Sequence, residues 1–508
     1  MTRTAQDIGA GLAPARPARA IQAGERIHVI GAAGAGASAA ALLAAGAGAV
    51  VTGCDSGGPS PYTPALEAAG IPLAWDHAAA HVEITPPPDR LAVTKALTAV
   101  APDHPELAAA RALGIPIEPW QQVVADAAVG RTLVAVAGTH GKSTTAGWLT
   151  HVLVTAGLDP SALVGALLPA SVTGGLPATA RQGRGAVFVV EADEYAGNFD
   201  AYAPDLVVLT NVDWDHPDVF ADRSAVVEAF AAWLARVPTA TLVVNGADPG
   251  ALELLDRLGE RTGTTIRVAI EADDGVGATD GAATDVAGRI GSVTPAATEL
   301  RVDLRDGGRA VATLPTAGRH NAENALLVAA AGEVLGLSPA EIVAGLESFG
   351  GVGRRLERKG EAAGVPVYDD YGHHPTAIRA TIAAVRQREP DRRLWVACEP
   401  LTFHRTAALL DQLAAALAEA DGIAVADIWA GRDTDNTVAS AAGLAAAVRA
   451  VAPAKEVGAP GSVESTAAWL ADRVRSGDVV LVMGGGHSYR IAELLLDALR
   501  QRAVASAG

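Results

Sequence analysis

A run of glycine and polar residues between a predicted strand and a predicted helix constrains the fold of this chain most. The apolar residues Leu133–Val136 predict a strand, Gly138–Thr144 reads Gly-Thr-His-Gly-Lys-Ser-Thr, and a helix is expected to follow Lys142. In that order the backbone N–H groups of the run and the positive end of the helix dipole face one point, where a phosphate group can bind. The run departs from the strict phosphate-loop pattern GxxxxGK(S/T), because Val136 stands where the first glycine is expected.

The side chains of this run suit a bound nucleotide. Lys142 is expected to reach the terminal phosphates, and Ser143 is expected to bind Mg²⁺. The alternative is a glycine-rich turn with a solvated lysine, which the flanking strand and helix disfavour.

Two further polar residues follow predicted strands. Glu191 comes directly after the apolar run Ala186–Val190, and His216 follows the run Leu206–Leu209 by a few residues. Ligands of α/β sheets bind at the carboxyl edge of the strands, so we expect Glu191 and His216 to be magnesium ligands. Each residue alone is better explained as an acidic helix start or a surface histidine. Only their placement after successive strands favours a metal site.

A second glycine-rich turn lies near the start of the chain. Residues 34–39 match the pattern GxGxxA after the predicted strand Ile27–Ile30, and Asp55 has the spacing of an acid that contacts a ribose hydroxyl. The turn fits the diphosphate of a dinucleotide or of a sugar nucleotide, while glycines that only allow close helix packing are the structural alternative. The segment Ile27–Cys54 lacks Asp, Glu, Lys and Arg, but its many glycines and alanines favour a buried strand, turn and helix over a membrane span.

Apolar runs alternate with helical segments along the chain, as parallel sheets require. We expect a loose leader over residues 1–24 and α/β domains over residues 25–129, 130–349 and 350–508. A length of 508 residues fits about three domains. Residues 273–298 are expected to form loops with short strands. The predicted fold is three consecutive α/β domains: Rossmann-like, phosphate-loop and Rossmann-like.

Net charge and cysteine content indicate which binding partners and which cellular compartment to expect. The formal net charge of −18 argues against nucleic acid bound on a basic surface, which needs clustered Lys and Arg. Cys54 and Cys398 lie far apart in the chain, which gives neither a disulfide framework nor a metal-ligand spacing and fits a reducing cytosol. The residues before Ile27 contain no continuous apolar segment of the kind that a secretory signal needs. We therefore expect a cytoplasmic protein without a membrane partner.

Polar residues also gather beside later strands. Gly318-Arg-His-Asn321 with Asn324 opens a predicted helix, where side-chain amides can hold a base or a phosphate, or only cap the helix. Arg354-Arg355, Asp369–Pro375 and Arg405 each adjoin a strand of the third region. Separately these are ordinary surface charges. Together they place Asp, His and Arg at one edge of a sheet.

The order of these motifs resembles the Mur ligase family: the first glycine turn, Gly-Thr-His-Gly-Lys-Ser-Thr, Glu-Ala-Asp-Glu at 191–194, His-Asn-x-x-Asn at 320–324 and Asp-Asp-Tyr-Gly-His-His-Pro at 369–375. The resemblance covers nearly all of residues 27–500. It implies an ATP-dependent, Mg²⁺-requiring ligase that activates a carboxylate on a UDP-sugar as an acyl phosphate. Within the family, the pattern is most similar to the members that join L-alanine to UDP-N-acetylmuramate in peptidoglycan precursor synthesis.

The resemblance also implies roles for individual residues. The catalytic residues would be Lys142, Arg405 and His374. The metal ligands would be Ser143, Glu191 and His216. The UDP-sugar would be held by Gly31, Gly34, Gly36 and Asp55. ATP would be held by Gly138, Thr139, His140, Gly141, Lys142, Ser143, Thr144, His320, Asn321, Asn324, Arg355 and Asp370.

One departure from the family pattern leaves the acceptor open. Residues 399–406 read Glu-Pro-Leu-Thr-Phe-His-Arg-Thr where the similar ligases have Gln-Pro-His-x-Tyr-x-Arg-Thr, so Leu401 replaces a histidine near the incoming amino acid. Glu191–Tyr195 and Pro119-Trp120 also resemble the ligase that recycles a murein tripeptide. That ligase and a non-catalytic UDP-sugar-binding relative are the alternatives, whereas an NAD-dependent oxidoreductase would explain only the first glycine turn. The oligomeric state stays open between monomer and homodimer.

Overall fold

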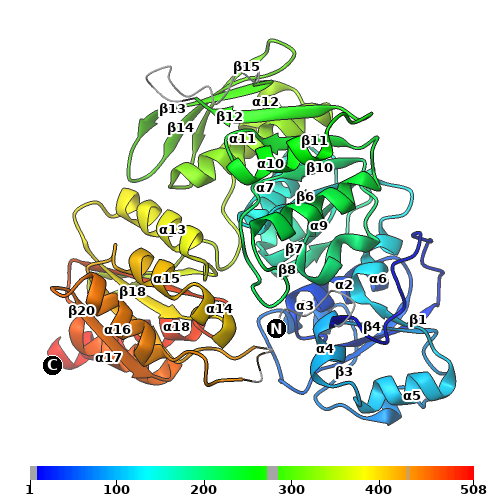
Figure 1. Cartoon of the computed structure of the whole chain (residues 1–508), viewed down its shortest axis with the longest axis horizontal. Helices are drawn as coiled ribbons and strands as arrows, with labels where there is room; N and C mark the ends of the chain where they lie inside the picture. Colours follow the sequence, from blue (N-terminus) through cyan, green and yellow to red (C-terminus); the bar gives the residue numbers. More distant parts are fainter. Residues whose placement is uncertain (1–7, 272–283, 432, 434, 508) are drawn as a thin grey trace.

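The chain forms three sheets flanked by helices in the computed structural model, which describes residues 8–271, 284–431, 433 and 435–507 (Figure 1). In Figure 1 the central domain, in green, lies above the first domain, in blue, and the third domain, in yellow to red. This arrangement confirms the predicted fold of three consecutive α/β domains.

The first sheet has the order β3-β2-β1-β4-β5, with parallel neighbours throughout. Its strands are β1 (Arg26–Ile30), β2 (Val50–Cys54), β3 (Leu73–Ala74), β4 (Arg90–Val93) and β5 (Ile117–Pro119). Its helices are α2 (Ala35–Gly46), α3 (Thr63–Ala68), η1 (Ala79–His81), α4 (Lys95–Val100), α5 (Pro105–Leu113) and α6 (Trp120–Ala127). The uncharged segment Ile27–Cys54 thus forms a strand, helix and strand, as expected. The strand order reverses between β1 and β4, the usual ligand position in an open α/β sheet.

The central sheet has the order β15-β14-β13-β12-β11-β10-β6-β9-β7-β8. Its strands are β6 (Thr132–Ala137), β7 (Ser161–Leu168), β8 (Ala178–Arg181), β9 (Val187–Ala192), β10 (Leu206–Leu209), β11 (Thr241–Asn245), β12 (Thr265–Ile270), β13 (Val286–Val293), β14 (Thr298–Asp303) and β15 (Arg309–Leu314). Its helices are α7 (Lys142–Thr155), α8 (Ala170–Thr173), η2 (Tyr195–Ala201), α9 (Arg223–Ala235), α10 (Pro249–Leu258), α11 (Arg319–Val334) and α12 (Pro339–Glu347). The expectation of only short strands over residues 273–298 was wrong for β13, while residues 273–283 lie outside the described part.

The third sheet has the order β16-β17-β21-β18-β19-β20, and β16 is antiparallel to its neighbour. Its strands are β16 (Glu357–Ala362), β17 (Val365–Asp370), β18 (Arg393–Glu399), β19 (Gly422–Ala426), β20 (Glu456–Gly461) and β21 (Asp478–Gly484). Its helices are α13 (Pro375–Arg388), α14 (Phe403–Ala408), α15 (Leu410–Leu417), α16 (Ala441–Val451), α17 (Val463–Arg473) and α18 (Tyr489–Ala507). The inner strands are continuous apolar runs because helices cover both faces of a parallel sheet.

Residues 8–24 are bound to the first domain, so the expectation of a loose leader was wrong for this stretch. The guanidinium group of Arg16 lies 2.7 Å from the carboxylates of both Glu118 and Asp126. Arg90 on β4 is buried and lies 2.8 Å from Glu118 and 2.5 Å from Asp126. The segment therefore completes a buried network of charges.

We expect Asp126→Asn to destabilise the first domain strongly. In the part of the chain that the structure describes, the substitution removes one of the three carboxylates around the buried guanidinium of Arg90 and one of the two around Arg16. Breaking a buried pair costs about 3 to 5 kcal/mol. Urea unfolding measures the change in the free energy of unfolding. Asp497→Asn, which removes an exposed pair with Arg500, is the control and should change little. Equal stability of the two variants would contradict the role of Asp126.

A short linker between the central and third domains is fixed on both sides. Gly353 donates its N–H to the carbonyl of Leu167 on β7 at 2.8 Å, and Val352 is buried in the central core. The next residue, Arg354, donates from its guanidinium to the carbonyl of Gly484 in the third domain at 2.7 Å. Arg354 has a φ of 58°, a left-handed conformation that non-glycine residues seldom adopt unless their surroundings hold it.

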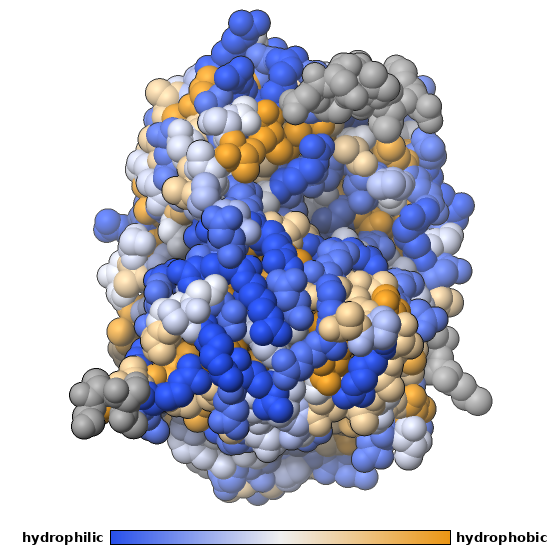
Figure 2. Space-filling view, turned by 90° about the vertical axis from the view of Figure 1, so that its left-hand side faces the viewer, coloured by the Kyte–Doolittle hydropathy of each residue, from blue (hydrophilic) through white to orange (hydrophobic). Residues whose placement is uncertain are grey.

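The outer surface is mainly hydrophilic on the side shown in Figure 2, where hydrophobic residues form only small, separate areas. Among the helices of the described residues, none is both long and apolar enough to cross a membrane.

Candidate active site

A cleft of about 1480 Å³ lies where the three domains meet. Many residues singled out in the sequence line it: Thr139, His140, Gly141, Lys142, Ser143, Thr144, Glu191, His216, His320, Asn321, Asn324, Arg355, Asp370, His374 and Arg405. Gly138 directly precedes Thr139 in the chain. Within the described residues, the lining does not include Gly31, Gly34, Gly36 or Asp55. The first domain instead contributes residues such as Tyr62 and Thr94.

The glycines of the phosphate-binding run are required by its backbone. Gly138 has a φ of 126°, and a Cβ atom there would lie 2.2 Å from Thr210 Oγ1. Gly141 has a φ of 81°, and a Cβ atom there would lie 2.8 Å from Asn324 Oδ1. Gly141 also caps α7, and no described side chain caps the first turn of this helix. Its first N–H groups are therefore available to an anion.

Lys142 is held by acidic residues that follow β9. Its Nζ atom donates to Glu194 Oε2 at 2.8 Å and lies 3.6 Å from Asp193 Oδ1. Burial disfavours the charge on Lys142, but the carboxylates of Glu194 and Asp193 outweigh burial and raise the pKa of the ammonium group. Burial raises the pKa of Glu194 to about 7, against the opposing effect of Lys142. Lys142 thus presents a positive charge beside the phosphate-binding run.

Ser143 connects this run to β9 and to the third domain. Its hydroxyl group donates to Glu191 Oε1 at 2.9 Å and accepts from Arg355 Nη2 at 2.8 Å. Glu191 belongs to β9, which ends at Ala192, so the strand extends past Glu191 and does not end before it as predicted. Glu191 also accepts the N–H of Gly165 at 2.5 Å. The hydroxyl and carboxylate are an oxygen pair of the type that Mg²⁺ prefers.

His216, which also lines the cleft, lies close to two acidic residues. Ligand atoms of Asp193, Glu194 and His216 all lie within 4.8 Å of one another. His216 Nδ1 also lies 3.0 Å from Arg405 Nη2. Asp193 and Glu194 were missed in the sequence-based site, although the three acids within residues 191–194 were the available signal.

Arg405 reaches from α14 of the third domain to the central domain. Its Nη2 atom lies 2.8 Å from Asp215 Oδ1, and both side chains are almost fully buried. Burial opposes the charge on Asp215, but Arg405 outweighs it and holds the pKa of this carboxyl well below its usual range. The Nε atoms of Arg405 and Arg355 are buried without a hydrogen-bond partner among the described residues. Unpaired guanidinium N–H groups in a cleft suit an anionic ligand such as phosphate.

His374 forms another contact between the central and third domains. Its Nε2 atom lies 3.0 Å from the carbonyl oxygen of Trp214, and its Nδ1 atom accepts the N–H of Thr376 at 3.3 Å. Burial and the neighbouring charge of His140 lower the pKa of His374 to about 4. The imidazole is therefore neutral near pH 7 and bonded on both sides to the backbone. Asp213, another residue missed from the sequence, accepts from the Thr376 hydroxyl at 2.8 Å.

The residues of α11 and β17 that were predicted to bind the nucleotide form hydrogen bonds within the protein. Asn321 Nδ2 donates to the carbonyl of Ala317 at 2.7 Å, and Asn324 Nδ2 donates to Asn321 Oδ1 at 3.4 Å. Asp370 accepts the N–H groups of two loop residues, Leu356 and Gly372. These bonds fix the helix start and the loop that border the phosphate-binding run.

Of the predicted UDP-sugar residues, Gly31 follows β1, Asp55 follows β2, and Gly34 and Gly36 lie at the start of α2. Asp55 accepts the N–H of Ala33 at 3.1 Å and of Gly57 at 2.8 Å, so it braces the glycine turn. A Cβ atom at Gly36 would lie 2.3 Å from the ring of Trp120. Close packing of α2 therefore requires this glycine, which favours the structural alternative at Gly36. For Gly31, Gly34 and Asp55, contact with a UDP-sugar stays a prediction.

Three domain comparisons cover most of the chain. Residues 26–132 match the Mur ligase family catalytic domain, residues 136–332 the Mur ligase middle domain, and residues 354–486 the Mur ligase glutamate ligase domain. A UDP-N-acetylmuramate–L-alanine ligase of Frankia casuarinae is 40% identical over 506 residues, covering 94% of this chain and 98% of that protein. The chain belongs to the Mur ligase family. The resemblance predicted from the motifs is confirmed.

Other Mur ligases agree in sequence and in fold. The UDP-N-acetylmuramate–L-alanine ligase of Roseiflexus sp. strain RS-1 is 38% identical over 482 residues, covering 94% of this chain and 99% of that protein. The solved structure of the UDP-N-acetylmuramate-alanine ligase MurC of Thermotoga maritima has a TM-score of 0.75 at 24% identity, covering 95% of this chain and 99% of the other. A murein peptide ligase of Psychrobacter arcticus has a TM-score of 0.69 at 25% identity, covering 94% and 99%. The Mur ligase fold thus extends over nearly the whole chain.

Proposed function

We propose that this Mur ligase uses ATP to join L-alanine to the carboxylate of UDP-N-acetylmuramate in peptidoglycan precursor synthesis. The relatives that are 40% and 38% identical over 94% of this chain bear the name of that ligase, which supports the substrates. One structural observation carries the proposal: Lys142 of the central domain and Arg405 of the third domain line the same cleft, which the first domain also borders.

The residues of the cleft match the chemistry of this reaction. A carboxylate does not react with an amine, because oxide would have to leave. ATP, when bound, supplies the phosphoryl group that turns the carboxylate into an acyl phosphate, from which phosphate can depart. Negative charge develops on phosphoryl oxygens and on a tetrahedral oxyanion. Cations that are already in position stabilise both. Lys142, Arg355 and Arg405 supply such cations, and the meeting of three domains excludes water that would hydrolyse the activated carboxylate.

We also propose that Ser143, Glu191 and His216, which all line the cleft, hold Mg²⁺ beside the phosphate-binding run. The carboxylates of Asp193 and Glu194 converge on the ammonium group of Lys142, so this part of the cleft favours positive charge. Hydroxyl and carboxylate oxygens are the ligands that Mg²⁺ prefers, and this donor set therefore fits the ion.

We expect Glu191→Ala and His216→Ala each to raise the Mg²⁺ concentration needed for half-maximal activity, by about tenfold or more. Each substitution removes a group proposed to bind the ion, and loss of even an outer residue that only orients a metal ligand weakens binding by about 10- to 100-fold. Phosphate release measured against Mg²⁺ concentration gives the shift. Glu228→Ala, which removes an exposed carboxylate on α9, is the control. Unchanged titrations in both test variants would remove these residues from the metal site.

The acceptor side of the cleft presents an apolar side chain. Leu401 lines the cleft and forms an isolated β-bridge with Trp429. His404, the other candidate for a polar contact to the amino acid, lies with its Nδ1 atom 3.2 Å from Asp433 and is half exposed. The structure therefore directs His404 toward Asp433.

Leu401→His should lower KM for L-alanine by about tenfold to a hundredfold. The new imidazole would restore a hydrogen bond to the amino acid, and a bond to a charged group is worth about 1.5 to 3 kcal/mol. KM for ATP should not change, and His404→Ala should leave both values unaltered. If KM for L-alanine does not respond to Leu401→His, the acceptor binds elsewhere.

The proposed function is tested by phosphate release from ATP in the presence of UDP-N-acetylmuramate and one acceptor at a time: L-alanine, L-serine, glycine or the murein tripeptide. Preferred turnover with L-alanine supports the proposal. Turnover with the tripeptide alone would establish the recycling ligase instead. Binding of the UDP-sugar without phosphate release for any acceptor would identify a non-catalytic relative.

We further propose domain boundaries at residues 25–129, 130–349 and 350–508, and action in the cytoplasm. The Mur ligase matches at residues 26–132, 136–332 and 354–486 support these boundaries. Both cysteines are free and buried, which fits a reducing compartment.

A further inference from the structure

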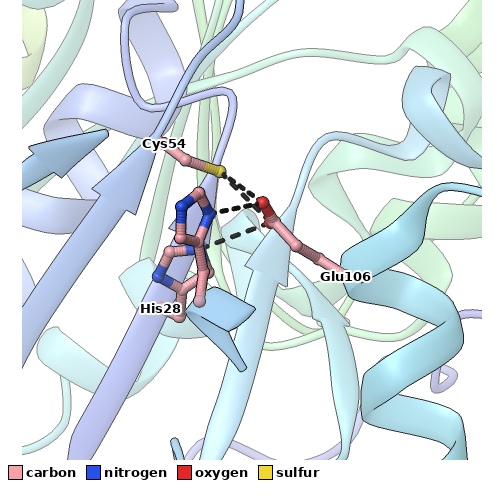
Figure 3. Close-up of side chains that lie close together, drawn as sticks. His28, Cys54 and Glu106 are labelled. Carbon is pink, nitrogen blue, oxygen red and sulfur yellow. Dashed lines mark hydrogen bonds and ion pairs between the residues drawn. The ribbon is translucent and has the colours of Figure 1, made fainter. Parts of the chain in front are cut away.

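A compact group of histidine, cysteine and glutamate side chains lies inside the first domain (Figure 3) and does not line the cleft. His28 comes from β1, Cys54 ends β2, His81 ends η1 and Glu106 lies in the first turn of α5. His28, Cys54 and Glu106 are almost completely buried. Four elements distant in sequence therefore converge on one point.

The distances within this group fit one small cation. Glu106 Oε2 lies 3.3 Å from His28 Nε2 and 3.1 Å from Cys54 Sγ, and Glu106 Oε1 lies 2.8 Å from His81 Nδ1. One ligand atom from each of the four residues can be chosen so that all lie within 4.8 Å of one another. Tetrahedral Zn²⁺ binds ligands at about 2.0 to 2.3 Å, which places them about 3.3 to 3.8 Å apart. Small shifts of the side chains would centre an ion among them.

Both histidines are held in the orientation that metal ligands need. His28 uses Nε2 toward the group, and its Nδ1 lies 2.8 Å from Thr52 Oγ1. His81 uses Nδ1 toward the group, and its Nε2 lies 3.4 Å from a carboxylate oxygen of Asp76. A histidine that binds a metal usually donates its far N–H to an oxygen acceptor such as a carboxylate, a carbonyl or water. The Thr52 hydroxyl and the Asp76 carboxylate can accept in this way.

Two more histidines adjoin the group. His77 Nδ1 lies 3.3 Å from Cys54 Sγ and 3.6 Å from Glu106 Oε1. The ring of His104 lies 4.4 Å from that of His77, and both of its nitrogens are buried without a hydrogen-bond partner among the described residues. A buried imidazole without a partner is costly, so His104 is an unsatisfied polar group beside these donors.

We propose that His28, Cys54, His81 and Glu106 form a zinc site that ties β1, β2, η1 and α5 together. Nitrogen, sulfur and carboxylate donors in one buried set are typical of Zn²⁺, and four protein ligands leave no open position for catalysis. Binding displaces the proton of the Cys54 thiol to solvent, because the thiolate is the ligand. The cysteine spacing did not reveal this site, since the other donors are histidines and a glutamate. The proposal does not depend on the proposed ligase activity.

The competing explanation is a hydrogen-bonded group around a buried carboxylate. Glu106 accepts from Cys54 and the backbone N–H of Ala78, and it contacts His28 and His81. That arrangement would satisfy Glu106 without any metal. Metal binding by the full chain therefore distinguishes the two explanations.

The test uses the full chain, freed of metal with a chelator and titrated with Co²⁺ and then Zn²⁺. We expect a thiolate-to-cobalt absorption band together with the visible spectrum of tetrahedral cobalt, both removed by one equivalent of Zn²⁺. Cys54→Ser should abolish the thiolate band and weaken zinc binding by about 100-fold or more. Cys398→Ser, which changes the other cysteine of the chain, should retain the band.

Two further variants guard against simple misfolding. His81→Asn changes a ligand whose side chain is 20% exposed, and it should also weaken zinc binding by about 100-fold. Thr52→Val removes the outer contact of His28 and should weaken it by about 10- to 100-fold. A folded wild-type chain without a thiolate band, or equal zinc affinity in the wild type and the His81 variant, would overturn the proposal.

Discussion

Lys142→Ala should lower kcat about a thousandfold or more while leaving the affinity for UDP-N-acetylmuramate nearly unchanged. The ammonium group is the cation that the structure places beside the phosphate-binding run, and loss of a preset charge from such a site costs several kcal/mol of transition-state stabilisation. The UDP-sugar is assigned to the first domain, so its binding should not need Lys142. Steady-state phosphate release and calorimetric titration with the UDP-sugar measure the two effects.

The control for this prediction addresses Glu194. Lys142→Ala leaves that buried carboxylate without its partner and is expected to destabilise the protein. The double variant Lys142→Ala, Glu194→Gln relieves this cost and should restore stability without restoring turnover. Lys455→Ala, which removes an ammonium group bonded to the carbonyl of Ala418 outside the cleft, should behave as the wild type. Equal loss of turnover and of UDP-sugar affinity in Lys142→Ala would contradict the assignment of the two ligands to different domains.

Arg405→Ala is expected to lower kcat by about a thousandfold, with little change in UDP-sugar affinity. An arginine that reaches a transferring phosphoryl group from another domain is worth about 10³ to 10⁵ in rate. Arg405 Nη2 lies 2.8 Å from Asp215 Oδ1, so the guanidinium group is already in position before the reaction begins. Single-turnover measurements of phosphate release would locate the loss in the chemical step.

Arg405→Lys separates the charge of this residue from its geometry, and Arg379→Ala is the control. Arg405→Lys keeps the charge but loses the planar fork, so we expect it to recover only part of the rate. Arg379→Ala removes an exposed arginine of the same domain, paired with Glu419, and should leave kcat unchanged. A normal kcat for Arg405→Ala would exclude Arg405 from the transferring phosphoryl group.

Features encoded in short stretches of sequence were predicted well. The strand, glycine turn and helix around Lys142 lie within one local run, and the strained backbone at Gly138 and Gly141 explains why that run needs its glycines. Glu191 could be placed near the carboxyl end of β9 because the residues that precede it in the strand are a continuous apolar run. These predictions required only strand and helix periodicity and the rule that ligands bind at the carboxyl edge of the sheet.

Features made by residues from distant elements could not be predicted in this way. Arg405 and His216 are 189 positions apart, and only the packing of two domains brings them to 3.0 Å. Arg16 looked like part of a loose segment because its carboxylate partners follow about a hundred positions later. The periodicity of apolar residues gives no information about such pairings, because each partner alone has the sequence context of an ordinary surface charge.

The linker between the central and third domains locates the pivot for any rotation of one against the other. Gly353 is bonded to the central sheet and Arg354 to the third domain, so the backbone bonds that join these two residues are where a rotation can occur without breaking either anchor. This linker is therefore the expected pivot. Swinging the third domain outward about it would pull Arg355 from Ser143 and Arg405 from Asp215 in the same movement. Opening for substrate entry would therefore also withdraw Arg355 and Arg405 from the central domain.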